Sequence, residues 1–237
     1  MKNVSFSNIT VRITGGNDGN GSGDGPVVIL LHGYGAPGDD LVPLAPALSA
    51  VPGTRFLFPA APLSLEPAFP AARAWWHVDW EARERQIRTT GSIDLSGDVP
   101  DGLPAARAWV SGLLDNLSAV LEVPGPVILG GFSQGAMLAC DVALHAPTPL
   151  VGLVLMSPTL VAQAEWLPRM ARRAGMPVFM SHGMHDPTLP FPMSERLLNH
   201  LVDAGLDVDW HPFPGGHEIP VPVCRDLIAF LHRVLGP

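Results

Sequence analysis

A serine between glycines is the residue of this chain best placed to act as a nucleophile. The segment Gly131-Phe132-Ser133-Gln134-Gly135 follows a short apolar run, 126–129, and opens an apolar stretch of helical character. A strand, a sharp turn and a helix form the setting in which G-x-S-x-G presents a serine hydroxyl above a sheet, and the glycines tolerate the strained turn. An N-cap serine is the simpler alternative. The setting nevertheless predicts a nucleophile at Ser133.

A serine hydroxyl needs a base to take its proton and an acid to orient that base. After a turn of this kind, the acid and then a histidine follow along the chain. Asp186 comes just after the apolar run 177–181, and His217 lies in a glycine-containing loop after the run 208–212. Because active-site groups gather where parallel strands end, we predict Asp186 as the acid and His217 as the base.

Acyl transfer also needs two N–H donors for the developing oxyanion. The backbone N–H of Gln134, directly after the serine, is one candidate, and the loop after an early strand, residues 31–35, should supply the other. Residues 33–38 also spell G-x-G-x-x-G, a dinucleotide-binding pattern. Pro37 interrupts the expected helix start, and Asp39 and Asp40 would repel a pyrophosphate, so the pattern is not interpreted as a nucleotide site.

Other histidines raise the question of a metal. His182 and His185 lie close together, but no third ligand stands at a recognisable spacing. The stretch that begins at His217 starts like a zinc-protease helix, yet Pro220 and the missing second histidine end that comparison. The expectation is therefore no metal and no organic cofactor.

Composition narrows the class of protein. The chain has 237 residues, of which 47% are hydrophobic and 15% charged, with a net charge of −8 and one lysine, Lys2. Such a composition excludes intrinsic disorder and argues against nucleic acid as a partner. No apolar run is long enough for a membrane helix and the N-terminus lacks a signal-peptide pattern, so a cytoplasmic location without integral membrane association is expected. Cys140 and Cys224 are read as buried apolar residues rather than a disulfide framework.

Short apolar runs alternate with helix-patterned stretches, which predicts a mostly parallel α/β sheet with helices on both faces, in one domain spanning 1–237. The expected strands are 27–31, 55–58, 126–129, 151–156, 177–181 and 208–212, and the expected helices are 103–121 with an N-cap at Asp101, 134–145, 193–204 and 218–235.

Three segments fit this alternation less well. Residues 4–13 predict a half-buried first strand with an irregularity near Ser7, and residues 15–25 a flexible hairpin connection, so that 1–25 form an N-terminal strand and a glycine-rich loop. Residues 63–98 show no clear period and are interpreted as an excursion over one edge of the sheet. Residues 157–175 are too short for a separate cap.

Several motifs in order resemble the phospholipase/carboxylesterase family of α/β-hydrolases, which includes acyl-protein thioesterases and small bacterial carboxylesterases. The resemblance runs from about residue 27 to about residue 231 and rests on segments 31–35, 58–62, 73–76, 130–139, 181–191 and 215–220. It implies an α/β-hydrolase fold without a large cap domain. It also implies Ser133, Asp186 and His217 as nucleophile, acid and base, and the amides of Tyr34 and Gln134 as oxyanion donors.

The resemblance implies a serine carboxylesterase. The lack of a cap segment and the tryptophans of 63–98 favour small, short-chain acyl esters, and the acidic chain favours uncharged ones. Trp75, Trp76 and Leu189 are candidate walls of the substrate pocket, with core packing as the alternative for the tryptophans. The stretch 75–80 is more aromatic than in thioesterase-like relatives and resembles bacterial esterases instead. Acyl-thioesterase, lysophospholipase or amidase chemistry on the same three residues, a non-catalytic ligand-binding fold, and a homodimer stay open as alternatives.

Overall fold

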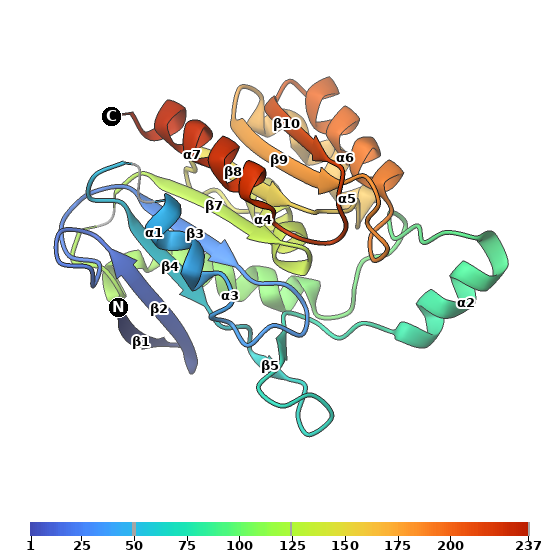
Figure 1. Ribbon diagram of the computed structural model, residues 1–237, viewed down its shortest axis with the longest axis horizontal. Helices are drawn as coiled ribbons and strands as arrows, with labels where there is room; N and C mark the ends of the chain where they lie inside the picture. The colour runs from blue at the N-terminus through green and yellow to red at the C-terminus, as the bar shows by residue number, and fades with distance from the viewer. Residues whose placement is uncertain (49–50, 124, 237) are drawn as a thin grey trace.

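An eight-stranded sheet organises the computed structural model, which describes residues 1–48, 51–123 and 125–236 (Figure 1). The strand order is β1-β2-β4-β3-β7-β8-β9-β10. All neighbours from β4 onward are parallel, and the two pairs at the N-terminal edge, β1–β2 and β2–β4, are antiparallel. These strands are β1 Lys2–Phe6, β2 Ile9–Gly15, β3 Val27–Leu31, β4 Arg55–Pro59, β7 Val127–Phe132, β8 Gly152–Met156, β9 Pro177–Gly183 and β10 Asp207–Phe213.

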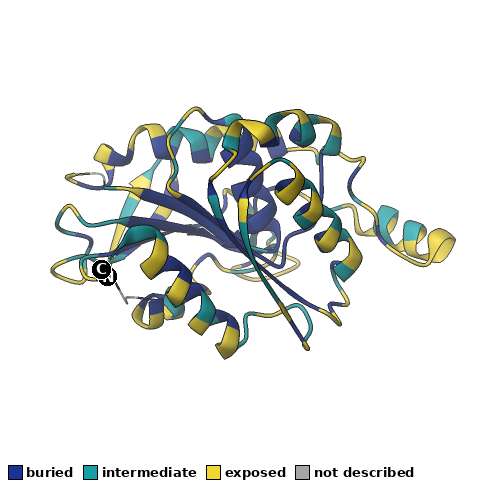
Figure 2. Cartoon of the chain, turned by 90° about the horizontal axis from the view of Figure 1, so that it is seen from above, coloured by how far each residue is buried: buried dark blue, intermediate teal, exposed yellow. Residues whose placement is uncertain are grey.

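Helices cover both faces of the sheet, which is why the central strands are apolar along their whole length. Every residue of β3 and β8 is buried, and Figure 2 shows these strands as a dark band between two helical layers. One layer holds α1 Ala45–Leu48 and α7 Val221–Leu235; the other holds α3 Leu103–Asp115, α4 Gln134–His145, α5 Gln163–Met170 and α6 Phe191–Asp203. The mostly parallel α/β prediction is confirmed. None of the helices in the described ranges combines the length and apolar character that a bilayer crossing requires.

The N-terminal segment differs from its prediction. It forms two strands, because Ser7 and Asn8 adopt positive φ angles of 47° and 64° and reverse the chain into a hairpin. Residues 15–25 are not a hairpin connection, since β4 lies between β2 and β3 in the sheet. This loop is held locally, with Asp18 Oδ1 accepting from the N–H groups of Asn20 and Ser22 at 2.8 and 3.2 Å.

Helix ends also shift from their predicted positions. Gly102, at φ 91°, is the N-cap of α3, so Asp101 lies outside the helix. The helix stops at Asp115, and a 3₁₀ turn, Leu117–Ala119, replaces its expected last turns. At the C-terminal end α7 begins at Val221 rather than residue 218, because Pro220 holds an extended backbone as its N-cap.

The excursion 63–98 contains regular structure that the sequence analysis missed. Two short paired strands, β5 Leu63–Ser64 and β6 Arg73–Ala74, precede α2 Trp80–Thr90, which projects from the body of the molecule (Figure 1). No residue of α2 is buried, so the apolar period that identifies packed helices is absent. Its signals are local: Asp79 caps the Ala82 N–H, Gly91 ends the helix, and Glu81–Arg85 and Glu84–Arg88 pair at i,i+4. Similarly, residues 157–175 hold the short helix α5.

Candidate active site

Ser133 occupies a strained turn between β7 and α4. Its φ of 55° and ψ of −118° lie in a region that side-chain-bearing residues rarely adopt. The flanking glycines are needed because the elbow approaches β3 closely: a Cβ at Gly131 or at Gly135 would overlap the carbonyl oxygen of Leu31. This close approach places the serine hydroxyl at the carboxyl edge of the sheet, at the N-terminus of α4.

The structure brings Ser133, His217 and Asp186 into one hydrogen-bonded series. His217 Nε2 lies 2.8 Å from Ser133 Oγ, and His217 Nδ1 lies 2.6 Å from Asp186 Oδ2. Asp186 follows β9 and His217 follows β10, the neighbouring parallel strand. Two backbone hydrogen bonds join these loops, from Met184 N–H to the Phe213 carbonyl and from His185 N–H to the Gly215 carbonyl. Parallel pairing at the sheet edge therefore carries the acid and the histidine to the serine.

The Asp186 carboxylate is buried and accepts hydrogen bonds on both oxygens. Oδ1 accepts from the N–H groups of Thr188 and Leu189 at 2.8 and 2.9 Å, and Oδ2 faces His217 Nδ1 and, at 3.2 Å, His182 Nε2. Burial alone would raise the pKa of Asp186, but hydrogen bonds from His182, His217 and Leu189 together hold that pKa well below its ordinary value. The carboxylate therefore stays ionised beside His217.

Two backbone N–H groups near the serine are unengaged. Among the described residues, neither the Tyr34 amide nor the Gln134 amide donates a hydrogen bond, which leaves both free for a substrate oxygen. The Tyr34 loop is held by its neighbour, since Gly35 N–H donates to the Arg73 carbonyl at 2.9 Å. The Gln134 side chain accepts from Trp75 N–H and donates to the Trp76 carbonyl, each at 2.9 Å. The elbow thus holds the segment that carries the tryptophans.

His32 and Arg73 support this loop, and the sequence analysis did not assign them a role. The buried imidazole of His32 donates from Nδ1 to the Gly33 carbonyl at 2.8 Å and accepts the Ala61 N–H on Nε2 at 2.9 Å. Burial lowers the pKa of His32 to about 4, so the ring is neutral. Arg73 Nε donates to the Ala61 carbonyl at 2.5 Å. Both residues lie inside segments that carry the family resemblance, 31–35 and 73–76. Their place in these motifs is the sequence signal that could have indicated a role.

A small cavity of about 190 Å³ opens above Ser133 and His217. Trp76 and Leu189 line it, together with Tyr34, Val78, Trp80, Arg83, Gln134, Met137 and Thr188. Trp75 does not. Its indole is buried in the core, donates from Nε1 to the His32 carbonyl at 2.9 Å and packs against Trp109. Both tryptophans are buried, at 2% and 3% exposure, so they differ in whether they reach the cavity and not in how far they are buried.

Comparison with known proteins agrees with this geometry. Residues 21–235 match the family described as Phospholipase/Carboxylesterase. The chain belongs to this family. The family assignment also confirms the α/β-hydrolase fold.

Proteins similar to this chain include thioesterases and an esterase of known structure. Acyl-protein thioesterase 1 of Mycosarcoma maydis is 27% identical over 88% of this chain and 90% of its own length. Acyl-protein thioesterase 1 of Eremothecium gossypii is 31% identical over 86% and 85%, respectively. The crystal structure of esterase PE8 superposes with a TM-score of 0.78 at 30% identity, covering 96% of this chain and 99% of that one.

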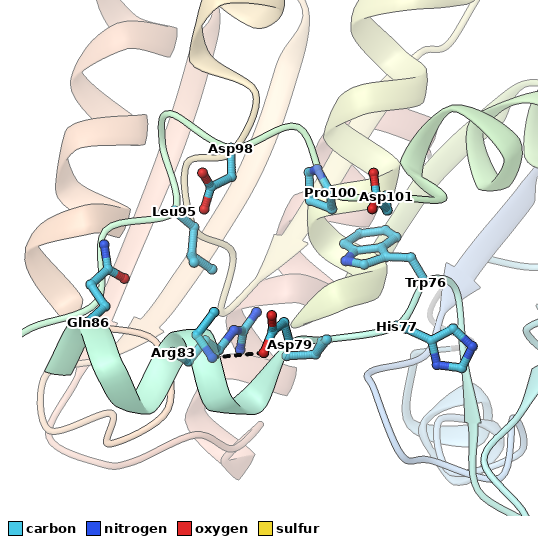
Figure 3. Close-up of a pocket in the computed structure, with 11 residues that line it drawn as sticks. Trp76, His77, Asp79, Arg83, Gln86, Leu95, Asp98, Pro100 and Asp101 are labelled. Carbon is cyan, nitrogen blue, oxygen red and sulfur yellow. Dashed lines mark hydrogen bonds between the residues drawn. The ribbon is translucent and has the colours of Figure 1, made fainter. Parts of the chain in front are cut away.

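A second, larger cavity of about 560 Å³ adjoins the first in this family member. It lies between α2 and the segment that leads into α3 (Figure 3). Trp76, Val78 and Arg83 line both cavities. Three aspartates, Asp79, Asp98 and Asp101, also line the larger cavity. The larger cavity is therefore acidic, whereas the smaller one has no carboxylate among its lining residues.

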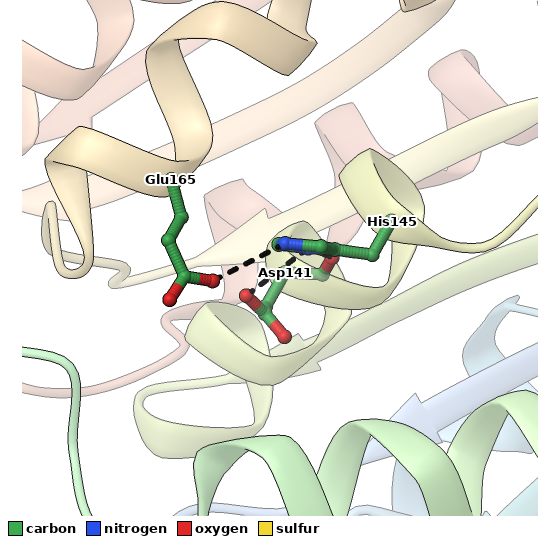
Figure 4. Close-up of side chains that lie close together, drawn as sticks. All are labelled: Asp141, His145 and Glu165. Carbon is green, nitrogen blue, oxygen red and sulfur yellow. Dashed lines mark hydrogen bonds and ion pairs between the residues drawn. The ribbon is translucent and has the colours of Figure 1, made fainter.

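A cluster of metal-ligand type lies away from the serine. Asp141, His145 and Glu165 come together between α4 and α5 (Figure 4). A guanidinium already occupies this cluster, because Arg107 Nε contacts Asp141 Oδ2 at 2.5 Å and Arg107 Nη2 contacts Glu165 Oε2 at 3.2 Å. The indole of Trp166 donates a further hydrogen bond to Asp141. The residues therefore suit a buried ion-pair network that joins α3, α4 and α5, and not a cation site.

Proposed function

We propose that this chain is a serine carboxylesterase that hydrolyses small, short-chain acyl esters through an acyl-enzyme. The observation that carries the proposal is the hydrogen-bonded series from Ser133 Oγ through His217 to Asp186, at 2.8 and 2.6 Å. These distances are those of a nucleophile with its base and the group that orients the base.

The proposed reaction begins when Ser133 Oγ attacks the ester carbonyl and His217 Nε2 takes its proton. Asp186, which is ionised, holds Nδ1–H and stabilises the imidazolium. The amides of Tyr34 and Gln134 donate to the oxyanion of the tetrahedral intermediate. His217 then protonates the leaving alcohol, and water repeats the sequence on the acyl-enzyme to release the acid. Every proton moves through His217, so the reaction requires no cofactor.

The size of the cavity supports a short acyl group. Taking about 30 Å³ for each water-sized group, a volume of about 190 Å³ accommodates roughly six such groups. A long acyl chain would need an extended apolar tunnel to bury each further methylene, which contributes about 0.8 kcal/mol. The cavity walls instead carry Trp76, Trp80 and Arg83.

Acyl-thioesterase activity is the second candidate, because the curated relatives quoted above are named acyl-protein thioesterases. The same three residues could open a thioester, since the attack and the proton transfers are alike. The leaving group separates the two: a matched oxyester and thioester of butyric acid report on it directly. We expect the ratio of kcat/KM on the oxyester to kcat/KM on the thioester to exceed the ratio of their uncatalysed hydrolysis rates.

A fluorophosphonate probe tests the proposal before any substrate is chosen. Wild-type protein should be labelled at Ser133, and Ser133→Ala should lose both labelling and ester hydrolysis, the latter by ~10⁴-fold or more. Ser157, a buried serine that also has a positive φ, provides the matched control, and Ser157→Ala should still be labelled. Labelling elsewhere, or a folded Ser133→Ala variant that keeps most of its rate, would overturn the assignment. No labelling at all would favour the non-catalytic alternative.

A further inference from the structure

Arg83 is a partly buried cation that has no ion-pair partner within the described part of the chain. It lies in the first turns of α2 and lines both cavities. Within the described residues its guanidinium makes no hydrogen bond or ion pair, and the dashed line at Arg83 in Figure 3 belongs to its backbone N–H, which donates to the Asp79 carbonyl. The other arginines of α2 differ: Arg85 pairs with Glu81 and Arg88 pairs with Glu84, on the solvent side.

The position of this guanidinium is fixed by aromatic packing. Arg83 Cζ lies 5.2 Å from the centroid of the Trp80 ring, and Trp80 meets Tyr34 edge-on at 5.6 Å. Tyr34 carries one of the free amides beside Ser133. Burial lowers the pKa of Arg83, although a guanidinium stays charged at any ordinary pH. The structure thus holds a partly desolvated charge that forms no close ion pair among the described residues, since Asp98 acts on it only at longer range, and a bound anion would stabilise it.

The charge of the smaller cavity indicates the kind of ligand. Among the residues that line it, Arg83 is the only Lys, Arg, Asp or Glu. The three aspartates line only the larger cavity, and Asp79 already caps α2. An anion is therefore attracted to Arg83 from the Ser133 side, despite the net charge of −8 that suggested uncharged substrates. One guanidinium neutralises one charge and matches a planar carboxylate in a bidentate pair.

We propose that Arg83 is a specificity-determining residue that binds a carboxylate carried by the acyl or the alcohol half of the ester substrate. This inference rests on the proposed esterase function and names its substrate class: half-esters of small dicarboxylic acids, or esters of small hydroxy acids.

Three esters with the same four-carbon acyl length separate the alternatives. Ethyl butyrate is neutral, ethyl hydrogen succinate carries a carboxylate at the end of its acyl half, and carboxymethyl butyrate carries one on its alcohol half. The readout is the ratio of kcat/KM on each anionic ester to that on ethyl butyrate. Hydrolysis is measured by titrating the acid that is released. The wild-type protein should favour one of the two anionic esters. The identity of the favoured ester shows whether Arg83 binds the acyl half or the alcohol half.

Variants on one helix make the comparison specific. Arg83→Gln should lower the favoured ratio by roughly 10- to 100-fold, as expected for a charge-assisted hydrogen bond, and Arg83→Lys should retain part of it. Arg88→Gln, which removes the same charge from the exposed side of α2, should leave the ratio unchanged. If Arg83→Gln slows all three esters equally, the residue only packs on Trp80 and the proposal is wrong. A wild type without preference for either anionic ester overturns it as well.

Binding to the Ser133→Ala variant tests the anchor apart from turnover. By calorimetry, this variant should bind the favoured anionic ester more tightly than ethyl butyrate, and adding Arg83→Gln should remove the difference. If wild type hydrolyses none of the esters yet this binding difference persists, the proposed function fails and the carboxylate site stands. If the neutral ester is hydrolysed and the difference is absent, the esterase stands and the carboxylate site fails.

Discussion

Single side chains around the sheet edge are held in defined ionisation states by their neighbours. Four hydrogen-bond donors keep Asp186 ionised despite its burial, whereas burial keeps His32 neutral, with one ring nitrogen donating and the other accepting. Both states lower stability as pH falls, because the unfolded chain releases each group to water, where it binds a proton at a higher pH than in the folded chain.

We predict that His32 makes stability fall between about pH 6.5 and pH 4. Burial lowers the pKa of His32 from 6.5 to about 4, so in this window the unfolded chain binds a proton that the folded chain does not, and unfolding becomes easier. The full effect is about 3 kcal/mol. Denaturant melts at several pH values should show the slope. His32→Gln should flatten it, although that variant is less stable, and the exposed His232→Gln should not. Loss of stability confined to lower pH would instead point to Asp186, whose pKa is lowered.

At the scale of elements, the turn before α4 is possible only with glycine beside it. We predict that Gly135→Ala is destabilised by several kcal/mol or does not fold, because its Cβ would overlap the Leu31 carbonyl. Gly112→Ala is the control, since Gly112 lies inside α3 and a Cβ there would meet nothing within 4 Å. That change should raise the free energy of unfolding by about 0.5–1 kcal/mol. Equal effects of the two substitutions on thermal unfolding would contradict this account.

The side chain of Gln134 links two elements, the elbow and the segment 75–76. We predict that Gln134→Glu, which can still accept from Trp75 N–H but cannot donate to the Trp76 carbonyl, changes KM and the acyl-length preference more than kcat. Gln134→Met removes both hydrogen bonds and should have the larger effect. The backbone amide of residue 134 persists in both variants, so a loss of kcat alone would mean that the side chain acts on the oxyanion site rather than on the pocket wall.

At the scale of the whole molecule, the excursion 63–98 supplies one wall of the cavity through Trp76, Val78, Trp80 and Arg83. We predict that kcat/KM on p-nitrophenyl esters peaks at short acyl chains, of roughly two to six carbons. Trp76→Ala should move the optimum toward longer chains, because Trp76 lines the cavity. Trp75→Ala should instead destabilise the fold by about 3–5 kcal/mol without moving it, because Trp75 lies in the core. A profile that rises steadily to palmitoyl esters would favour the thioesterase alternative.

Much of this arrangement follows from local sequence. The runs at 27–31 and 177–181 and the helix 134–145 appear in the structure with nearly the predicted bounds, because strands buried on both faces must be apolar and a helix packed on a sheet shows its period. The sequence also shows that Ser133, Asp186 and His217 each follow a predicted strand, in that order along the chain. Parallel pairing brings strand ends to one edge, so the sequence alone predicted that the three residues would be neighbours.

Other features depend on contacts that no local pattern encodes. Helix α2 buries no residue, so it lacked the period that reveals a helix. Trp75 and Trp76 are chemically identical neighbours, and only the packing of His32 and Trp109 against Trp75 decides which one lines the cavity. The same holds for Arg83, Arg85 and Arg88: sequence shows three arginines on one helix, whereas the tertiary structure leaves one of them unpaired beside Ser133. Residue type and the succession of elements along the chain are properties of the local sequence, but the direction in which a side chain points is set by the residues that pack against it.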